Sequence, residues 1–187
     1  VSGSDTAVQF GTYGTYGTKG VGSTSNVPGP RDQAISWSDS SGNLWLFGGE
    51  GIGGFFNDLW KFNPATSEWM WVSGSSTANQ DGVYGTQGVS SSINVPGARS
   101  NAIPWSDSSG NLWLFGGSYY AGGYLNDLWK YDVTANNWIW MGGTNTTNQP
   151  ATYGTKGISS ASNIPGARQM SVGWTDNNGD FWMFGAW

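Results

Sequence analysis

The sequence contains no cysteine and no histidine, and charged residues make up only 10% of its 187 positions. Without cysteine the chain has no disulfide, no thiolate nucleophile and no sulfur-ligated zinc or iron–sulfur site. Without histidine it lacks the commonest general base and the commonest transition-metal ligand. Seven Lys and Arg against twelve Asp and Glu argue against a nucleic-acid partner, because phosphate neutralisation needs clustered cations. We therefore predict no cofactor, no metal site and no nucleic-acid binding.

Long hydrophobic runs are missing as well. No stretch approaches the ~20 apolar residues of a transmembrane helix, so we predict no membrane insertion. Residues 1–10 show neither the basic nor the apolar region of a signal peptide, which fits a mature secreted chain as well as a cytosolic one. What is abundant is glycine, with 31 residues, and tryptophan, with 13. Many turns between short apolar, aromatic-rich segments are typical of all-β proteins.

An internal repeat of 68–69 residues dominates the chain. A segment of the type Asn-Val-Pro-Gly-x-Arg ends at Arg31 and returns at Arg99 and, with Ile for Val, at Arg168. Residues 37–49 return letter for letter at 105–117, and a looser copy occupies 174–186. We predict one domain, with repeats at about 4–74, 75–143 and 144–187.

Each repeat contains four runs of strand length. In the first repeat they lie near residues 33–38, 44–47, 58–62 and 68–72, bounded by Gly, Pro, Asn or Ser. No segment keeps a 3.6-residue apolar period, so no helix of consequence is expected. Four antiparallel strands per repeat predict the blade of a β-propeller.

The repeat resembles that of kelch β-propellers. The shared marks are an arginine that opens the first strand, an apolar second strand that closes in Gly-Gly, an Asn-Asp-Leu-Trp third strand and a tryptophan in the fourth. The resemblance implies an architecture like the central domain of galactose oxidase, whose copper–radical chemistry needs His and Cys and is excluded here. The repeat exceeds the family's ~50 residues, and this long variety resembles secreted or surface proteins of microbes. We accordingly expect an extracellular location, secreted or at the cell surface.

The strand count gives two full sets and half of a third, whereas closed propellers usually have about 4–8 blades. Three explanations stay open: a portion of a longer propeller, a subunit completed by other chains, or an engineered piece. An open strand edge recruits other strands, so we expect self-association.

The loops are the expected place of function. The long connectors should share one face, and their aromatics differ between repeats, as adaptable contact surfaces do. The candidate residues are Phe55, Phe56, Tyr119, Tyr120 and Tyr124. The alternative is that some of these rings tuck under their loops.

From these loops we predict a non-enzymatic extracellular binding or assembly module that docks a protein or a glycan. Two alternatives are a lectin-like propeller and a structural subunit that assembles into rings or filaments through its incomplete blade. No catalytic residue is assigned, because titratable groups are few and unclustered. Glu50 and Glu68, the only glutamates, have no acidic neighbour in sequence, although a spatial pair stays open.

Four further features have two interpretations each. Arg31, Arg99 and Arg168 could ring the central channel and hold an anion, or pair with carboxylates such as Asp58 and Asp127.

The hairpin aspartates Asp39, Asp107 and Asp176 suggest turn capping rather than calcium binding, because carboxylates on separate turns do not converge on one ion. Most tryptophans should pack between blades, with Trp187 as an assembly contact. Asn145 begins a glycosylation sequon, which also arises by chance.

Overall fold

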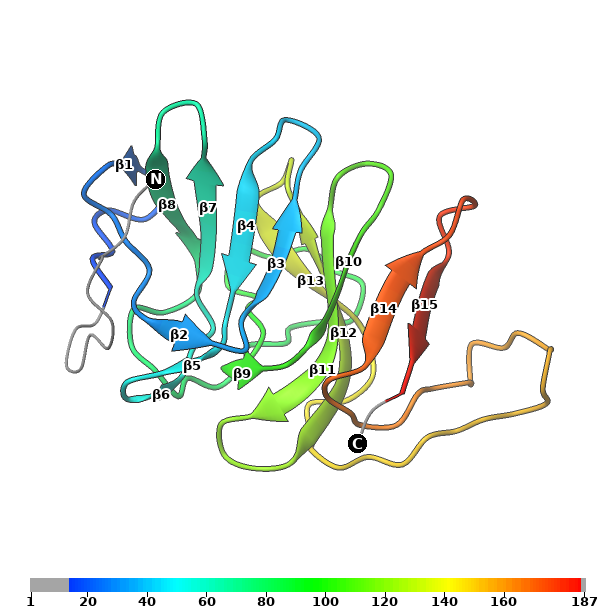
Figure 1. Ribbon diagram of the computed structural model, residues 1–187. Helices are drawn as coiled ribbons and strands as arrows, with labels where there is room; N and C mark the ends of the chain where they lie inside the picture. Colours follow the sequence, from blue (N-terminus) through cyan, green and yellow to red (C-terminus); the bar gives the residue numbers. More distant parts are fainter. Residues whose placement is uncertain (1–13, 186–187) are drawn as a thin grey trace.

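The computed structural model describes residues 14–185, and all of its regular structure is β (Figure 1). Two antiparallel blades are followed by one further hairpin, which confirms the predicted all-β partial propeller. Trp187 lies outside the described residues. No helix in residues 14–185 is long and apolar enough to cross a bilayer.

The first blade has the sheet order β1-β8-β7-β4-β3, with β3 innermost. Its strands are β1 (Gly22–Ser23), β3 (Ile35–Ser38), β4 (Leu44–Phe47), β7 (Leu59–Asn63) and β8 (Glu68–Ser73). The second blade consists of β10 (Ile103–Ser106), β11 (Leu112–Tyr119), β12 (Tyr124–Asp132) and β13 (Asn137–Gly142). The third repeat contributes β14 (Val172–Thr175) and β15 (Phe181–Phe184). The innermost strands β3, β10 and β14 are neighbours.

Tight hairpins and long connectors emerge at opposite ends of the strands, as predicted (Figure 1). At the hairpin end, the Asp39 carboxylate accepts hydrogen bonds from the backbone N–H groups of Ser41 and Asn43 and from the Trp45 indole, at 2.9–3.0 Å. Burial acts to raise the pKa of Asp39, but these hydrogen bonds outweigh it and hold the pKa below its usual value. Asp107 and Asp176 cap their turns in the same way. The aspartates are therefore turn residues.

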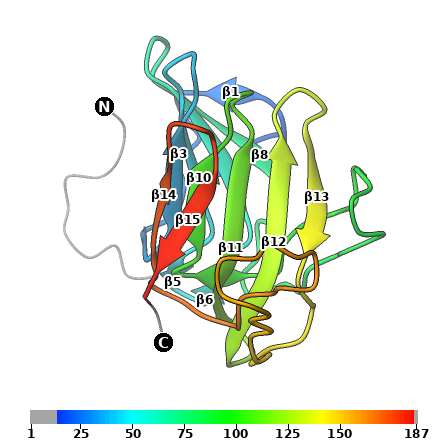
Figure 2. The ribbon, with the colours of Figure 1, turned by 90° about the vertical axis from the view of Figure 1, so that its right-hand side faces the viewer.

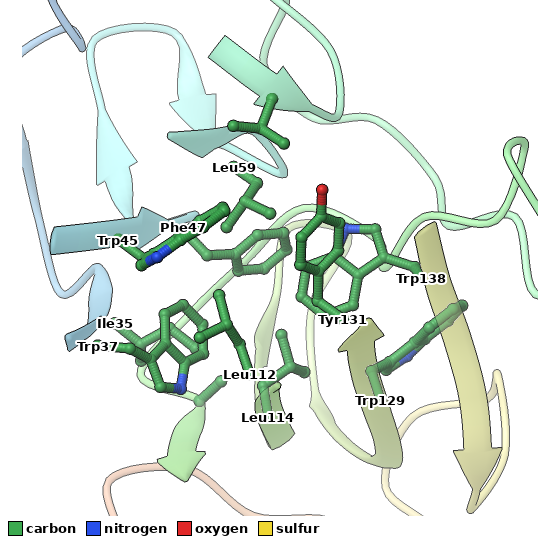
Figure 3. Close-up of a cluster of buried hydrophobic side chains, with 12 residues drawn as sticks. Ile35, Trp37, Trp45, Phe47, Leu59, Leu112, Leu114, Trp129, Tyr131 and Trp138 are labelled. Carbon is green, nitrogen blue, oxygen red and sulfur yellow. The ribbon is translucent and has the colours of Figure 1, made fainter. Parts of the chain in front are cut away.

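The core lies between blades rather than inside one (Figure 3). Alternate side chains of β3 and β4 face the second blade, which packs Leu112, Leu114, Tyr131 and Trp138 against them. The Trp37 indole N–H donates to the Trp105 carbonyl oxygen at 3.0 Å, and the Trp105 indole donates to the Trp182 carbonyl oxygen at 3.0 Å. These tryptophans pack and bond from blade to blade, as the sequence predicts.

The long connectors add an outer strand that the four-strand prediction does not include. In the first two repeats the connector runs along the outer edge of the blade that it precedes, before it enters the innermost strand. Gly22 and Ser23 pair with Met70 and Trp69 of β8, and in the second blade Ser91 bridges Trp138 of β13. The Asn26 amide donates to the Trp69 carbonyl oxygen at 3.0 Å, which fastens this segment. The extra length of the repeat thus wraps the outside of the blade.

The third repeat presents its sheet to solvent (Figure 2). Its inner face packs Phe181 and Met183 on the second blade. The outer face carries Val172, Trp174, Trp182 and Phe184, which are 46–75% exposed. The equivalent side chains of the second blade include Ile103, Trp105 and Phe115, which are at most 6% exposed because the third repeat covers them.

Candidate functional site at the loop-end rim

The innermost strand of each repeat begins next to a residue with a left-handed backbone conformation. Gln33, Asn101 and Met170 have φ of 54°, 55° and 57°. The Asn101 N–H donates to the Gln33 carbonyl at 3.0 Å, and the Met170 N–H donates to the Asn101 carbonyl at 3.1 Å. Positive φ is uncommon outside glycine, although turn and bend residues such as Ser67 and Asn136 share it here. What sets Gln33, Asn101 and Met170 apart is that they are linked from strand to strand, and we call these three positions the rim at the long-connector end of the innermost strands.

Short strands fold beside the rim. In the first blade β2 (Arg31–Asp32) pairs with β5 (Glu50–Gly51), which pairs with β6 (Gly54–Phe55). The second glycine of the Gly-Gly motif, Gly49, allows the chain before β5 to lie this close to β2. A Cβ on Gly49, at φ +92°, would lie 2.6 Å from the Asp32 carbonyl oxygen. Only glycine allows both this conformation and this contact.

The pairing sets two carboxylates side by side. Asp32 and Glu50 are directly opposed in the β2–β5 register, and both are exposed. Directly opposed residues of antiparallel strands have Cβ atoms about 4.5–5.5 Å apart, and like charges there are unfavourable. In the second blade β9 (Arg99–Ser100) pairs with β11, and the opposed residues are Ser100 and Ser118. The acidic pair is thus specific to the first blade and is not needed by the scaffold.

A second group of polar side chains lies on the loops of the second blade. The Tyr119 hydroxyl donates to the Asp81 carboxylate, as does the Tyr120 hydroxyl at 2.9 Å. The two rings are 4.7 Å apart between centroids. These hydrogen bonds hold the pKa of Asp81 below its usual value, whereas burial, together with Asp81, raises the pKa of Tyr119. The structure therefore brings two predicted loop residues together around a carboxylate.

The other predicted loop aromatics separate into two kinds. Phe56 is only 4% exposed, and the Arg31 guanidinium lies 4.4 Å from its ring centroid. Its assignment as a loop contact is wrong, because the backbone turns this ring under the loop. Phe55 and Tyr124 are half-buried, and their backbones hold the connectors through Asn79 and Asn148.

The repeated arginines are structural in the two complete blades. The Arg31 guanidinium makes two bonds to the Asp58 carboxylate, at 2.5 and 2.9 Å, and Arg99 does the same to Asp127 at 2.6 and 2.7 Å. The side chains of the two arginines are 5% and 0% exposed. Of the two roles left open, carboxylate pairing is the one that the structure shows at Arg31 and Arg99. The anion ring is not formed at these two positions, because both guanidinium groups are buried and paired.

An open depression of about 470 Å³ lies between the innermost strands of the two blades. Its lining consists of Ser36, Trp37, Ser38, Leu44, Pro104, Trp105 and Ser106. Ser38, Leu44 and Ser106 lie at the hairpin end of these strands, so the depression extends away from the rim.

Sequence reasoning missed both carboxylate groupings. Asp32 and Glu50 meet only through the register of β2 and β5, and Asp81 reaches Tyr119 from another connector. The regularity behind the first pair is structural: in both blades the residue after the repeated arginine lies opposite the residue after Gly-Gly. No group of three or more acidic residues that could hold a metal occurs within residues 14–185. Asn145 is exposed, and its glycosylation stays a prediction.

Comparisons with known proteins confirm the architecture. A solved structure titled "Structure of YjhT" superposes with a TM-score of 0.52 at 18% identity, over 86% of this chain and 35% of that one. The fold is that of a kelch-type β-propeller. No family model matches the chain.

Curated relatives match over a shorter segment. N-acetylneuraminate epimerases of Escherichia coli K12 and Shigella sonnei are each 49% identical over 47 residues, which is 22% of this chain and 12% of each relative. A protein named N-acetylneuraminate epimerase 2, from Escherichia coli O6:H1, matches equally. The kelch-type chain thus spans about an eighth of these curated relatives.

These names correct the functional prediction. The relatives are enzymes, whereas the sequence analysis predicts a non-enzymatic binding or assembly module, lectin-like or structural in its alternatives. That prediction is wrong. It depended on the loop aromatics and on the few, unclustered titratable groups along the chain.

Proposed function

We propose that this chain is part of an epimerase acting on an N-acetylneuraminate-type sugar, with the rim facing the substrate. The observation that carries the proposal is the 49% identity to N-acetylneuraminate epimerases over 47 residues. The kelch-type fold and the exposed Asp32–Glu50 pair agree with it.

The chemistry suits a protein without histidine or cysteine. Epimerisation at the anomeric carbon of a free sugar proceeds by ring opening. A base takes the proton of the anomeric hydroxyl while an acid delivers a proton to the ring oxygen, so that the bond between that oxygen and the anomeric carbon breaks. Closure on the opposite face reverses both transfers. The reaction needs only positioned proton donors and acceptors, a role that carboxyl groups fill.

We assign these two roles to Asp32 and Glu50. Amide groups suited to sugar hydroxyls stand beside them, since Gln33 and Asn101 occupy the rim and are joined at 2.6 Å. The sugar's own carboxylate requires a cation, but the guanidinium groups of Arg31 and Arg99 are already paired. Neither arginine is therefore free to bind the sugar carboxylate.

The test follows the interconversion of N-acetylneuraminate anomers by NMR with the intact chain. Asp32→Asn and Glu50→Gln should each lower the rate by about 10²–10⁴-fold, the usual contribution of a positioned acid or base. Glu68→Gln is the matched control, because Glu68 lies on the outer strand β8, away from the rim. Full activity in both rim variants, or no acceleration and no sugar-induced shifts in the wild type, would refute the proposal.

A further inference from the structure

The third repeat carries an open groove of about 360 Å³ between its long connector and β15. Residues that line it include Tyr153, Lys156, Ile158, Asn163, Arg168 and Met183. Polar and charged residues alternate there with apolar ones such as Ile164, and Tyr153 is 78% exposed. The groove is therefore an open surface of mixed character that includes several hydrogen-bonding groups.

The first two repeats show what covers this surface. The equivalents of Tyr153 are Tyr16 and Tyr84, which donate to Asp58 and Asp127 at 2.6 Å. Their rings also pack against Trp60 and Trp129 of the third strands, at 4.8 and 4.9 Å between centroids. In both complete blades the hairpin of third and fourth strands, β7–β8 or β12–β13, thus fills the position of the groove.

The amide groups follow the same rule. Asn94, the second-repeat equivalent of Asn163, donates to the Trp138 carbonyl of the fourth strand at 3.2 Å. The Asn163 amide has no such fourth-strand partner in the described part of the chain. It donates instead to the Ile158 carbonyl of its own connector, at 3.1 Å. Gln87, the equivalent of Lys156, donates to the Met141 carbonyl at 3.0 Å, whereas Lys156 makes no such bond within residues 14–185.

Arg168 is already held in the orientation that a carboxylate requires. Its Nε donates to the Gly166 carbonyl at 2.9 Å and its Nη1 to the Gly185 carbonyl at 3.4 Å. Arg99 makes the same two carbonyl contacts, at 3.0 Å each, and adds two bonds to Asp127. Among the described residues no carboxylate fills that last position at Arg168. The free guanidinium edge suits bidentate pairing.

We propose that this groove binds a β-hairpin of the third-and-fourth-strand type, supplied by another polypeptide segment. Its first strand adds to the edge of β15, as β12 adds to β11. Its Asn-Asp-Leu-Trp motif places the carboxylate between Arg168 and Tyr153 and the indole beneath the Tyr153 ring. Its second strand, of the Trp-x-Trp type, presents a carbonyl to Asn163. The partner is thus defined by one buried carboxylate and a following tryptophan.

A second copy of this chain does not offer such a segment. Asp58 and Asp127 are 0% exposed, as are Trp60 and Trp129, and each hairpin is paired within its own blade. Donation by a second copy would require a complete blade to open. The groove proposal is independent of the proposed epimerase activity, because it concerns the third repeat and not the rim of the first blade.

The first test titrates the intact chain with a synthetic peptide copying residues 120–143 and follows heat by calorimetry. We expect one peptide per chain. Asp127→Asn in the peptide and Arg168→Gln in the chain should each weaken binding about tenfold or more, as loss of a hydrogen bond to a charged group does. The two changes together should weaken it little further, because they remove the same pair. Equal binding of both peptides, or equal binding by both chains, would overturn the proposal.

A second test removes the dependence on a free peptide forming a hairpin. A copy of residues 119–143 is joined after Trp187 to give a fusion protein. The urea midpoint of this fusion is compared with that of a second fusion, in which the copied Asp127 is replaced by Asn. The proposal expects a higher midpoint for the Asp form and loss of that gain with Arg168→Gln. No peptide binding together with equal midpoints would overturn it. So would a concentration-dependent mass of the unfused chain that Arg168→Gln abolishes, because a second copy would then fill the groove.

Discussion

The second blade and the third repeat contain the same motif residues in different surroundings. Arg99 is buried against Asp127, Tyr84 is covered by Trp129, and the Trp105 indole reaches the next blade. Their third-repeat counterparts Arg168, Tyr153 and Trp174 lack the corresponding partners within residues 14–185. The residue type therefore does not determine its contribution to stability. The contribution depends on whether the partner is present, which the third strand of the same blade supplies for Arg99 and Tyr84 and the next blade supplies for Trp105.

The largest expected difference concerns the arginines. Arg99→Gln should lower the free energy of unfolding by about 3–5 kcal/mol, because it leaves the buried Asp127 carboxylate without its partner. Arg168→Gln should change it by about 0.5 kcal/mol or less, as surface substitutions do. Urea denaturation at pH 7 measures both values. Similar losses in the two variants would remove the distinction between the repeats.

Replacing the tyrosines should also lower the free energy of unfolding more in the second blade than in the third repeat, but by a smaller amount than replacing the arginines. Tyr84→Phe removes a hydrogen bond to the Asp127 carboxylate, which is worth about 1.5–3 kcal/mol. Tyr153→Phe removes a hydroxyl from a ring that is 78% exposed, and little change is expected. The same denaturation experiment compares them, with Tyr16→Phe as a positive control from the first blade. A costly Tyr153→Phe variant would show that this ring has a partner in solution.

Alkaline pH should weaken the stabilisation that the Tyr84–Asp127 hydrogen bond gives the second blade. Burial, followed by the charge of Asp127, raises the pKa of Tyr84 in the folded chain. The unfolded chain ionises near pH 10 while the folded one does not, so this stabilisation is complete below about pH 10 and declines above it. Each such tyrosine costs about 1.4 kcal/mol per pH unit there. Tyr84→Phe should flatten the decline in unfolding free energy, which urea denaturation repeated across this pH range measures.

The parts of the fold that sequence predicts are those encoded locally or periodically. The Asp39 turn is contained within a few residues, and the alternation of Ile35 and Trp37 reveals the buried face of β3. The outer strand could not be found in the same way. Gly22 and Ser23 carry no apolar alternation, and their partners lie far along the chain in β8.

The candidate site shows the same limit. Asp32 and Glu50 become a pair only when Gly49 lets β2 approach β5. Phe55 and Phe56 are adjacent in sequence, and only the fold decides that Phe56 turns inward. The functional prediction was wrong, and what corrects it is the names of the curated relatives, not a pattern in the sequence.

The outer strand also bears on how such a chain can grow. Each complete repeat fastens its beginning to its end, since Asn26 bonds to Trp69 across 43 residues and Asn94 to Trp138 across 44. In each complete repeat the connector that precedes the first strand is therefore hydrogen-bonded to the fourth strand, so the beginning and the end of the repeat lie side by side. Copying one whole unit inserts a blade without cutting any sheet. The identical copy of residues 37–49 at 105–117 is what growth by unit duplication leaves behind.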